Sequence, residues 1–217
     1  MSEEKHDKIQ KRYNRIAPVY DLMEGLMEKG KMGDWRQNLW QKVNDRISQL
    51  KANNDQLKLL EAGVGSGKNI EYYPEQIEIY AIDFSPKMLK EAEKKANKFN
   101  KEVKLVEMDI QNLDFEDNYF DLIVTSCVFC SVPDPVQGLK ELKRVLKEDA
   151  RIIMLEHMRS QNELVGKFMD WFNWVSLYTW GANINRKTME NIEKAGLEIV
   201  EVNDLMSDIV KEIELRK

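Results

Sequence analysis

The sequence has little cysteine, proline and glycine, and no long apolar run. Two cysteines among 217 residues cannot form a disulfide framework, and this low content is typical of a reducing compartment. With 5 prolines and 10 glycines, no segment has the composition of an interdomain linker. The least polar segment, residues 122–132, is far shorter than the about 20 residues of a membrane-spanning helix. Because residues 1–8 are also too polar for a signal peptide, we expect a cytoplasmic protein.

Charge and hydrophobic content limit the class of protein further. The chain has 33 Lys and Arg against 38 Asp and Glu, a net charge of −5. Phosphate groups repel such a surface, so we expect no nucleic-acid partner. Hydrophobic residues make up 42% of the chain, which is enough for a folded core and excludes general disorder. The length predicts a single domain over residues 1–217.

Strand and helix patterns alternate through most of the chain. Strands are predicted at residues 57–62, 77–82, 103–108, 120–128, 151–155, 197–202 and 208–215. Helices are predicted at residues 85–99, 136–146 and 188–195, and residues 5–50 are also helical in pattern, with a break at Ala17-Pro18. The alternation predicts an α/β fold with a doubly wound, mostly parallel, Rossmann-like sheet of about seven strands. In such a sheet, ligands bind beyond the carboxyl ends of the strands.

A glycine-rich loop follows the first predicted strand. Gly63, Gly65 and Gly67 have the spacing G-x-G-x-G, which is neither the G-x-G-x-x-G of nicotinamide enzymes nor a Walker loop. Such glycines let a ligand approach the main chain closely, although a tight turn between strand and helix uses them too. Asp83 and Asp109 end the next two strands, where an acid is placed to accept ribose hydroxyls or to contact a base. One loop with two acids in these positions favours a nucleoside-containing ligand.

These segments, in this order, resemble the class I S-adenosylmethionine-dependent methyltransferases. The resemblance covers about residues 55–155 and rests on residues 59–67, 81–88, 109–110 and 120–124. It implies that S-adenosylmethionine is the cofactor and that the chain is an enzyme. A Pro-Gly-Gly turn that the family often has before the fifth strand is replaced here by residues 147–150.

The resemblance also implies roles for individual residues. Gly63, Gly65 and Gly67 shape the loop around the methionine part of the cofactor, with Glu61 as the support of that loop. Asp83 holds the ribose. The adenine is enclosed by Phe84, Met88, Asp109 and Ile110, and the floor near the sulfonium is lined by Thr125, Cys127 and Val128.

Residues outside this core resemble narrower groups of methyltransferases. Residues 12–21 are similar to a segment of the quinone-pathway C-methyltransferases and the bacterial phosphatidylethanolamine N-methyltransferases, which folds over the cofactor. This resemblance makes Tyr13 and Tyr20 candidates for contact with the cofactor, and Tyr20 also with the acceptor; packing under the first helix is the alternative. Residues 128–132, 154–157 and 181–188 are similar to animal methyltransferase-like proteins that methylate alkyl thiols, although their hydrophobic N-terminal anchor is lacking.

Two further segments concern the acceptor. His157 and Arg159 follow the fifth strand and are candidates for binding an anionic headgroup or taking a proton; a solvated loop pair is the alternative. Residues 168–180 are rich in aromatic side chains, which favours a hydrophobic or amphiphilic acceptor and, with the basic segment 5–15, a peripheral membrane contact. Simple packing of a helical lid insertion is the alternative. The domain is expected to divide into a helical cover (1–50), a cofactor-binding core (55–155), and a lid with C-terminal strands (156–217).

The function predicted from the sequence is methyl transfer to a phospholipid amine or a thiol. A quinone-precursor carbon is the alternative acceptor, and a non-catalytic module that binds S-adenosylmethionine is the alternative from another class. The C-x-x-C spacing of Cys127 and Cys130 does not indicate a metal site, because a structural zinc needs four ligands and only two histidines accompany these cysteines. We therefore expect no metal.

Overall fold

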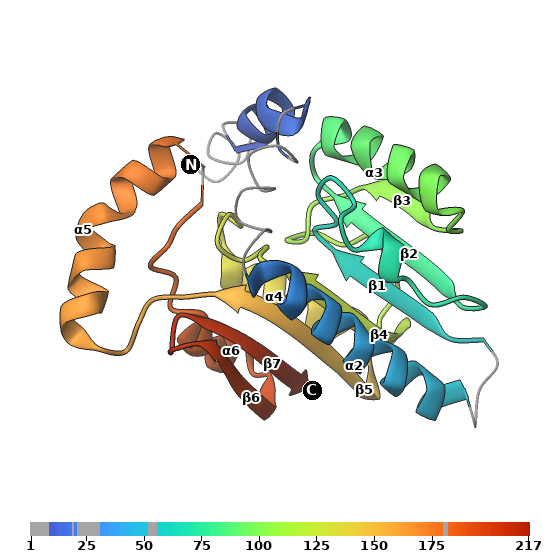
Figure 1. Ribbon diagram of the computed structural model, residues 1–217. Helices are drawn as coiled ribbons and strands as arrows, with labels where there is room; N and C mark the ends of the chain where they lie inside the picture. Colours follow the sequence, from blue (N-terminus) through green and yellow to red (C-terminus); the bar gives the residue numbers. More distant parts are fainter. Residues whose placement is uncertain (1–8, 19, 21–30, 52–55, 180–181) are drawn as a thin grey trace.

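The central sheet has the strand order β3-β2-β1-β4-β5-β7-β6 (Figure 1). Strand β7 runs antiparallel to β5 and β6, and the other neighbours are parallel. This computed structural model describes residues 9–18, 20, 31–51, 56–179 and 182–217. The strands are β1 Lys58–Ala62, β2 Glu78–Asp83, β3 Lys104–Glu107, β4 Phe120–Ser126, β5 Leu146–His157, β6 Glu198–Met206 and β7 Val210–Arg216. The helices are α2 Gly33–Lys51, η2 Ile70–Tyr72, α3 Pro86–Phe99, α4 Pro135–Val145, α5 Glu163–Thr179 and α6 Thr188–Ala195, and residues 9–18 are helical as well.

Helices cover both faces of the sheet, and each face has its own apolar layer. On one face α2 and α3 pack against the sheet, and Trp40 of α2 is fully buried with its ring centre 4.9 Å from that of Tyr73. On the other face α4 and α6 provide Leu142 and Ile192, both fully buried. A parallel strand buried on both faces is a continuous apolar run, which is why these strands were visible in the sequence. The predicted doubly wound α/β fold is confirmed.

Polar caps place the starts of α3 and α4 at the same edge of the sheet. Ser85 precedes Pro86 and its Oγ accepts a hydrogen bond of 3.2 Å from the N–H of Met88. Asp134 does the same for α4, with a bond of 3.0 Å from the N–H of Gln137. A capping side chain followed by proline fixes the first turn of a helix. The chain therefore turns sharply after β2, which keeps Asp83 at the carboxyl edge.

Several predicted boundaries are wrong. Strand β4 ends at Ser126 and not at residue 128, because Cys127 takes a positive φ of 55° and turns the chain out of the sheet. Strand β5 is longer than predicted and includes residues 147–150, where the family often has a turn. The helix of residues 9–18 runs through Ala17 and Pro18 without the expected break.

The crevice of the fold lies between β1 and β4. Strand β1 pairs with β2 on one side and with β4 on the other, so the strand order reverses here. The connections that leave these carboxyl ends diverge to opposite faces, which opens a crevice for a ligand. Among the described helices, none is both long and apolar enough to cross a bilayer.

Candidate active site

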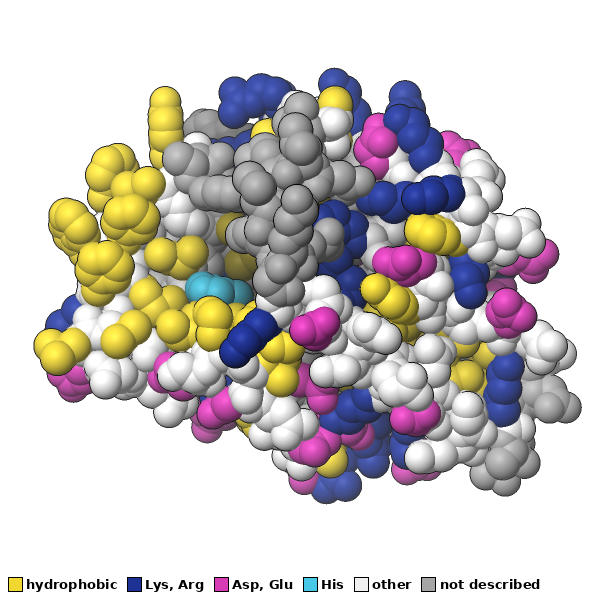
Figure 2. All heavy atoms as spheres, viewed as in Figure 1, with side chains coloured by type: hydrophobic (Ala, Val, Ile, Leu, Met, Phe, Trp, Pro, Cys, Tyr) yellow, Lys and Arg dark blue, Asp and Glu magenta, His cyan; other side chains and the backbone are white. Residues whose placement is uncertain are grey.

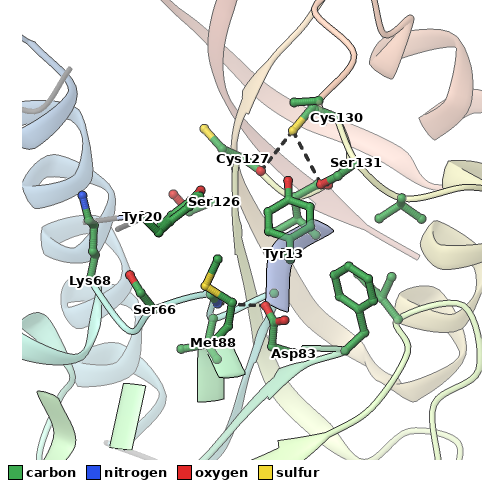
Figure 3. Close-up of a pocket in the computed structure, with 18 of the residues that line it drawn as sticks. Tyr13, Tyr20, Ser66, Lys68, Asp83, Met88, Ser126, Cys127, Cys130 and Ser131 are labelled. Carbon is green, nitrogen blue, oxygen red and sulfur yellow. Dashed lines mark hydrogen bonds between the residues drawn. The ribbon is translucent and has the colours of Figure 1, made fainter. Parts of the chain in front are cut away.

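A cavity of about 440 Å³ lies beyond the carboxyl ends of the parallel strands. This volume is in the range of small-molecule sites, about 300–1,000 Å³. Twelve of the predicted site residues line it: Tyr13, Tyr20, Gly63, Gly65, Asp83, Phe84, Met88, Asp109, Ile110, Cys127, Val128 and His157. Figure 3 shows how side chains from distant segments surround this space, with Asp83 and Met88 on one side and Cys130 and Ser131 on the other. The structure thus gathers most of the predicted residues in one place.

The three loop glycines have different surroundings. A Cβ added to Gly63 would lie 2.4 Å from a methyl carbon of Val128, and one added to Gly67 would lie 2.7 Å from the Cα of Ala92 in α3. Gly65, with a φ of +54°, has nothing within 4 Å of such a Cβ. Gly63 and Gly67 therefore allow close packing of the loop, whereas Gly65 leaves its backbone open to a ligand. Gly67 faces α3 and is absent from the cavity lining that the described residues form.

Glu61 lies behind the loop and is fully buried. Its carboxyl group accepts hydrogen bonds from the side chains of Asn69 and Tyr73, which follow the loop. Burial raises the pKa of Glu61 to about 7, although these two bonds and the charge of Arg36 act in the opposite direction. Glu61 does not line the cavity, but Asn69 does, so its contact with the site is indirect.

Asp83 joins the glycine loop to the edge of β2. Its Oδ2 accepts a bond of 2.9 Å from the N–H of Gly65, and its Oδ1 one of 2.9 Å from the N–H of Ser85. Burial raises the pKa of Asp83 to about 6, against the effect of these two bonds. A carboxylate has about four acceptor positions, so both oxygens retain capacity for hydroxyl donors from the cavity.

Asp109 also lines the cavity, at the end of β3. The side-chain amide of Gln111 donates to both of its carboxyl oxygens, at 3.0 and 2.9 Å. This contact fixes the plane of the carboxyl group beside the apolar side chains of Met88 and Ile110. The resulting wall is apolar with one oriented acceptor, as recognition of a base requires.

The helix of residues 9–18 docks directly on the end of β2. The ring of Tyr13 meets that of Phe84 edge to face with the centres 5.7 Å apart, and it lies 6.3 Å from the ring of Tyr20. The hydroxyl of Ser85 donates to the side-chain oxygen of Asn14 at 2.8 Å. Figure 3 shows Tyr13 within the space between the two walls of the cavity. In its described part, this segment lines the cavity through Tyr13, Ile16 and Tyr20.

Glu156, which the sequence analysis did not assign, fixes the loop after β4. Its Oε1 accepts bonds from the N–H of Val128 at 3.0 Å, the hydroxyl of Thr125 at 3.3 Å and the N–H of Phe129 at 3.4 Å. Glu156 is fully buried, and burial raises its pKa to about 7. Thr125 is buried behind the loop and is not among the described lining residues, contrary to expectation. An acid within an apolar strand was the signal that could have identified Glu156.

Residues 183–186 also form hydrogen bonds with the loop that follows β4. Asn183 donates to the carbonyl of Cys130 through both its backbone N–H and its side-chain amide, each at 2.9 Å. The guanidinium of Arg186 donates to the carbonyl of Val132 at 2.6 Å. The thiol of Cys130 donates to the carbonyl of Cys127 at 3.2 Å, and burial raises its pKa to about 12. This thiol therefore stays protonated.

The two residues predicted after the fifth strand have different positions. His157 lines the cavity, and burial lowers its pKa, so its imidazole is neutral at neutral pH. Arg159 is absent from the described lining, because its guanidinium forms hydrogen bonds of 2.9 and 3.1 Å with Asp170 of α5. In this structure Arg159 anchors α5, and its predicted role in binding an anionic headgroup or taking a proton stays a prediction.

Several other residues that line the cavity were not predicted from the sequence. Two are cations at the glycine-loop end, Arg36 of α2 and Lys68. Others surround the end near His157: Cys130, Ser131, Val132, Pro133, Ser176, Asn183 and Ile184. Residues 128–132 and 181–188 contributed to a family resemblance, but nothing in their spacing shows that they meet.

Comparisons with known proteins agree with this site. The family described as a methyltransferase domain matches residues 60–154. A demethylmenaquinone methyltransferase of Lactobacillus johnsonii is 30% identical over 80% of this chain and 71% of that protein. A 2-phytyl-1,4-naphtoquinone methyltransferase of Nostoc punctiforme is 30% identical over 75% and 70%. A phosphatidylethanolamine N-methyltransferase of Cereibacter sphaeroides is 29% identical over 70% and 68%.

Solved structures show the same fold. A crystal structure of an S-adenosylmethionine-dependent methyltransferase from Aquifex aeolicus has a TM-score of 0.55 and 22% identity, covering 79% of this chain and 88% of that one. The [4+2]-cyclase SpnF has a TM-score of 0.65 at 17% identity, covering 81% and 80%. Since a cyclase shares the fold, the fold alone does not define the reaction.

Fold, cavity and relatives together define the class. The chain belongs to the class I S-adenosylmethionine-dependent methyltransferases. It is an enzyme, and S-adenosylmethionine is its cofactor. The cavity fits this molecule, because it combines the open backbone at Gly65, the acceptor oxygens of Asp83 and an apolar wall at Met88 and Ile110.

Proposed function

We propose that this methyltransferase transfers the methyl group of S-adenosylmethionine to a hydrophobic or amphiphilic small molecule, either a phospholipid amine or a thiol. The observation that supports this most is the continuity of the cavity, which extends from Asp83 at one end to His157 and Ile184 at the other. Groups suited to a polar donor and groups suited to an apolar acceptor therefore line the same cavity.

The donor end is the part near the glycine loop. We propose that Asp83 accepts the ribose hydroxyls and that Asp109, with its apolar neighbours Met88 and Ile110, holds the adenine. Arg36 and Lys68 bring positive charge to the loop, which suits the carboxylate of the methionine part. Within one domain that spans residues 1–217, we propose that residues 1–50 act as the cover and residues 55–155 bind the cofactor; of the cover, the structure describes residues 9–18, 20 and 31–50.

The acceptor end combines apolar and polar groups. Val128, Val132, Pro133 and Ile184 provide its apolar surface, and Ser131, Ser176, Asn183 and His157 provide polar groups. Burial of an alkyl group here contributes about 25 cal/mol per Å² of apolar surface, which favours an acceptor with a hydrocarbon part. A sugar or nucleotide acceptor lacks such a part.

The bound sulfonium supplies an already activated methyl group, so the protein has to position the acceptor and free its lone pair. The neutral imidazole of His157 is able to accept the proton that an amine or a thiol loses. Tyr20 lines the same cavity and is a candidate for orienting the acceptor. Proximity within one cavity accounts for the remaining rate enhancement.

A quinone-precursor carbon is the second candidate acceptor. The relatives from Lactobacillus johnsonii and Nostoc punctiforme, both 30% identical, carry names that specify quinone-type acceptors. A prenylated ring would suit the same apolar end, and His157 would then take a proton from the ring hydroxyl. The names of these relatives favour the quinone-precursor carbon, whereas the cavity suits a phospholipid amine, a thiol and a quinone precursor alike.

The test is methyl transfer from S-adenosylmethionine labelled in its methyl group. The acceptors are phosphatidylethanolamine vesicles, an alkyl thiol with sulfide as its non-alkyl control, and a demethylated quinone reduced in the assay. We expect label in the lipid amine or in the alkyl thiol. Label in the quinone alone would replace the first candidate with the second, and label in sulfide but not in the alkyl thiol would contradict an apolar acceptor end.

Peripheral membrane contact through residues 5–15 and 168–180 is also part of this proposal. Of these segments, residues 5–8 and 180 lie outside the described part of the chain. The structure describes residues 9–15 and 168–179 of the two segments.

A further inference from the structure

Helix α5 carries its large apolar side chains on the side that faces away from the rest of the protein. Seven of them are 40% to 81% exposed, and they include Phe168, Trp171, Trp174 and Tyr178. Figure 2 shows these side chains as a continuous apolar area over α5, at the left of the molecule. A contiguous exposed surface of this kind marks an interaction site.

The inward side of the same helix carries the buried Met169 and several polar groups. The hydroxyl of Ser176 donates to the carbonyl of Ala182 at 2.8 Å, and the side-chain oxygen of Asn173 accepts a bond of 2.9 Å from the N–H of Ile184. Gly166 lies against the guanidinium of Arg159. A helix on a protein surface normally has the opposite arrangement, with its apolar side inward. The aromatic side chains of α5, from Phe168 to Tyr178, are therefore turned outward and do not form a packed core.

The width of the exposed apolar surface of α5 indicates the kind of partner that binds there. At about 100° per residue, the exposed side chains from Leu164 to Tyr178 span about half of the helix circumference. A partner helix needs only a narrow seam. A lipid interface contacts a helix over a broad side, and it favours Trp and Tyr at the level of the headgroups.

Charge and position point to the same occupant. Lys11 and Arg15 are exposed on the helix of residues 9–18. Lys167 is exposed on α5, where it forms an ion pair with Glu163, so the helix of residues 9–18 supplies the positive charge. Figure 2 shows Lys and Arg side chains at the upper edge of the molecule, beside the apolar area. The cavity separates the two helices, since Tyr13 lines it from one and Ser176 from the other. Cations at a membrane surface attract anionic lipids.

We propose that the outward side of α5 docks in the plane of a bilayer that contains anionic lipid, so that the acceptor enters the cavity from the membrane between α5 and the helix of residues 9–18. This inference rests on the proposed function for the identity of the acceptor. The docking itself is independent of any methyl transfer and is testable without an acceptor.

The experiment is co-sedimentation with vesicles of phosphatidylcholine and phosphatidylglycerol. The double variant Trp171→Glu/Trp174→Glu removes the apolar contact, and Val200→Glu/Met206→Glu changes two exposed side chains of β6 as the matched control. We expect the first variant to bind vesicles at least about tenfold more weakly than the wild type, and the control to bind normally. Retained binding of S-adenosylmethionine shows that each variant is folded.

A second measurement does not depend on any variant. Lipids with brominated acyl chains quench tryptophans that reach the hydrocarbon boundary, so we expect quenching of the wild-type fluorescence. Absence of vesicle binding by the wild type, equal binding by the α5 variant, or absence of quenching would overturn the proposal. Self-association in solution that only the α5 substitutions abolish would assign this side to a second copy of the chain. Failure of every acceptor with vesicle binding intact would count against the proposed function and not against docking.

Discussion

The Oε1 atom of Glu156 accepts a hydrogen bond of 3.0 Å from the backbone N–H of Val128. This bond joins the end of strand β5 to the loop after β4, which lines the cavity beside Gly63. Because Val128 contacts Gly63 directly, one buried carboxyl group sets the separation between the two loops that form the crevice.

Substitution of Glu156 tests this positioning. Glu156→Gln retains an oxygen that accepts the same three bonds, so we expect a near-normal KM for the acceptor. Glu156→Leu leaves two N–H groups and a hydroxyl without an acceptor, at a cost of about 1–3 kcal/mol each in stability. We expect this variant to unfold at a lower temperature and to show a raised acceptor KM, with Glu193→Leu on the exposed side of α6 as the neutral control. Equal KM values for the Gln and Leu variants would show that Glu156 does not position the loop.

Three buried acids predict an unusual dependence of stability on pH. Burial raises the pKa of Glu61 and Glu156 to about 7 and that of Asp83 to about 6. Between the ordinary carboxyl pKa near 4 and these values, the folded state binds more protons than the unfolded chain. The free energy of unfolding without cofactor should therefore fall as the pH rises from about 4.5 to about 8, and these groups should add no further change above that range.

Urea unfolding at half-unit pH intervals measures this slope, and Glu156→Gln should reduce it because it removes one of the three groups. Stability that increases steadily from pH 4.5 to 7 would contradict the directions of these pKa shifts. Glu163→Gln, on the exposed surface of α5, is the control that should leave the slope unchanged.

Asp83→Ala tests the donor end of the cavity. The substitution removes the proposed acceptor for the ribose hydroxyls and the partner of the Gly65 N–H. Hydrogen bonds to a charged group contribute about 1.5–3 kcal/mol each, so we expect the Kd for S-adenosylmethionine to rise by at least about tenfold. Isothermal titration calorimetry gives this value, with the exposed Asp114→Ala as control. An unchanged Kd would remove Asp83 from the cofactor site.

His157→Ala tests the proposed base. General base catalysis contributes about 10²–10⁴-fold, so we expect kcat to fall by at least about 100-fold while cofactor binding is retained. Since burial lowers the pKa of His157, the wild-type kcat should increase with pH in a range below the ordinary histidine value near 6.5. The variant should lose this increase. Persistence of the same pH profile without the imidazole would show that another group takes the proton.

The sequence predicted the donor end better than the acceptor end, for a physical reason. Parallel strands bring their carboxyl ends to one edge, so a loop at Gly63 and an acid at Asp83 are neighbours whatever the rest of the chain does. The contacts of Glu156 and Asn183 depend on how the loop after β4 turns, and Cys127 takes its positive φ only in the tertiary structure. Those residues were therefore not found from spacing.

Contacts that form only in the tertiary structure also explain why the positions of Arg159 and of the α5 side chains were not predicted. Arg159 pairs with Asp170, eleven residues further along the chain, and local sequence gives no sign that α5 folds back on it. The aromatic composition of residues 168–180 was visible in the sequence, but the direction in which these side chains point was not. That direction follows from the hydrogen bonds of Asn173 and Ser176, which tie the polar side to residues 182–184.

We propose that one cavity holds donor and acceptor together, and a side chain that blocks only the acceptor end is the sharpest check of this arrangement. Ile184→Trp places a large side chain there, and Val200→Trp on β6 is the exposed control. For Ile184→Trp we expect a nearly unchanged Kd for S-adenosylmethionine and loss of methyl transfer to the amphiphilic acceptor identified with labelled donor. Undiminished transfer, with the cofactor still bound, would show that the acceptor binds outside this end of the cavity.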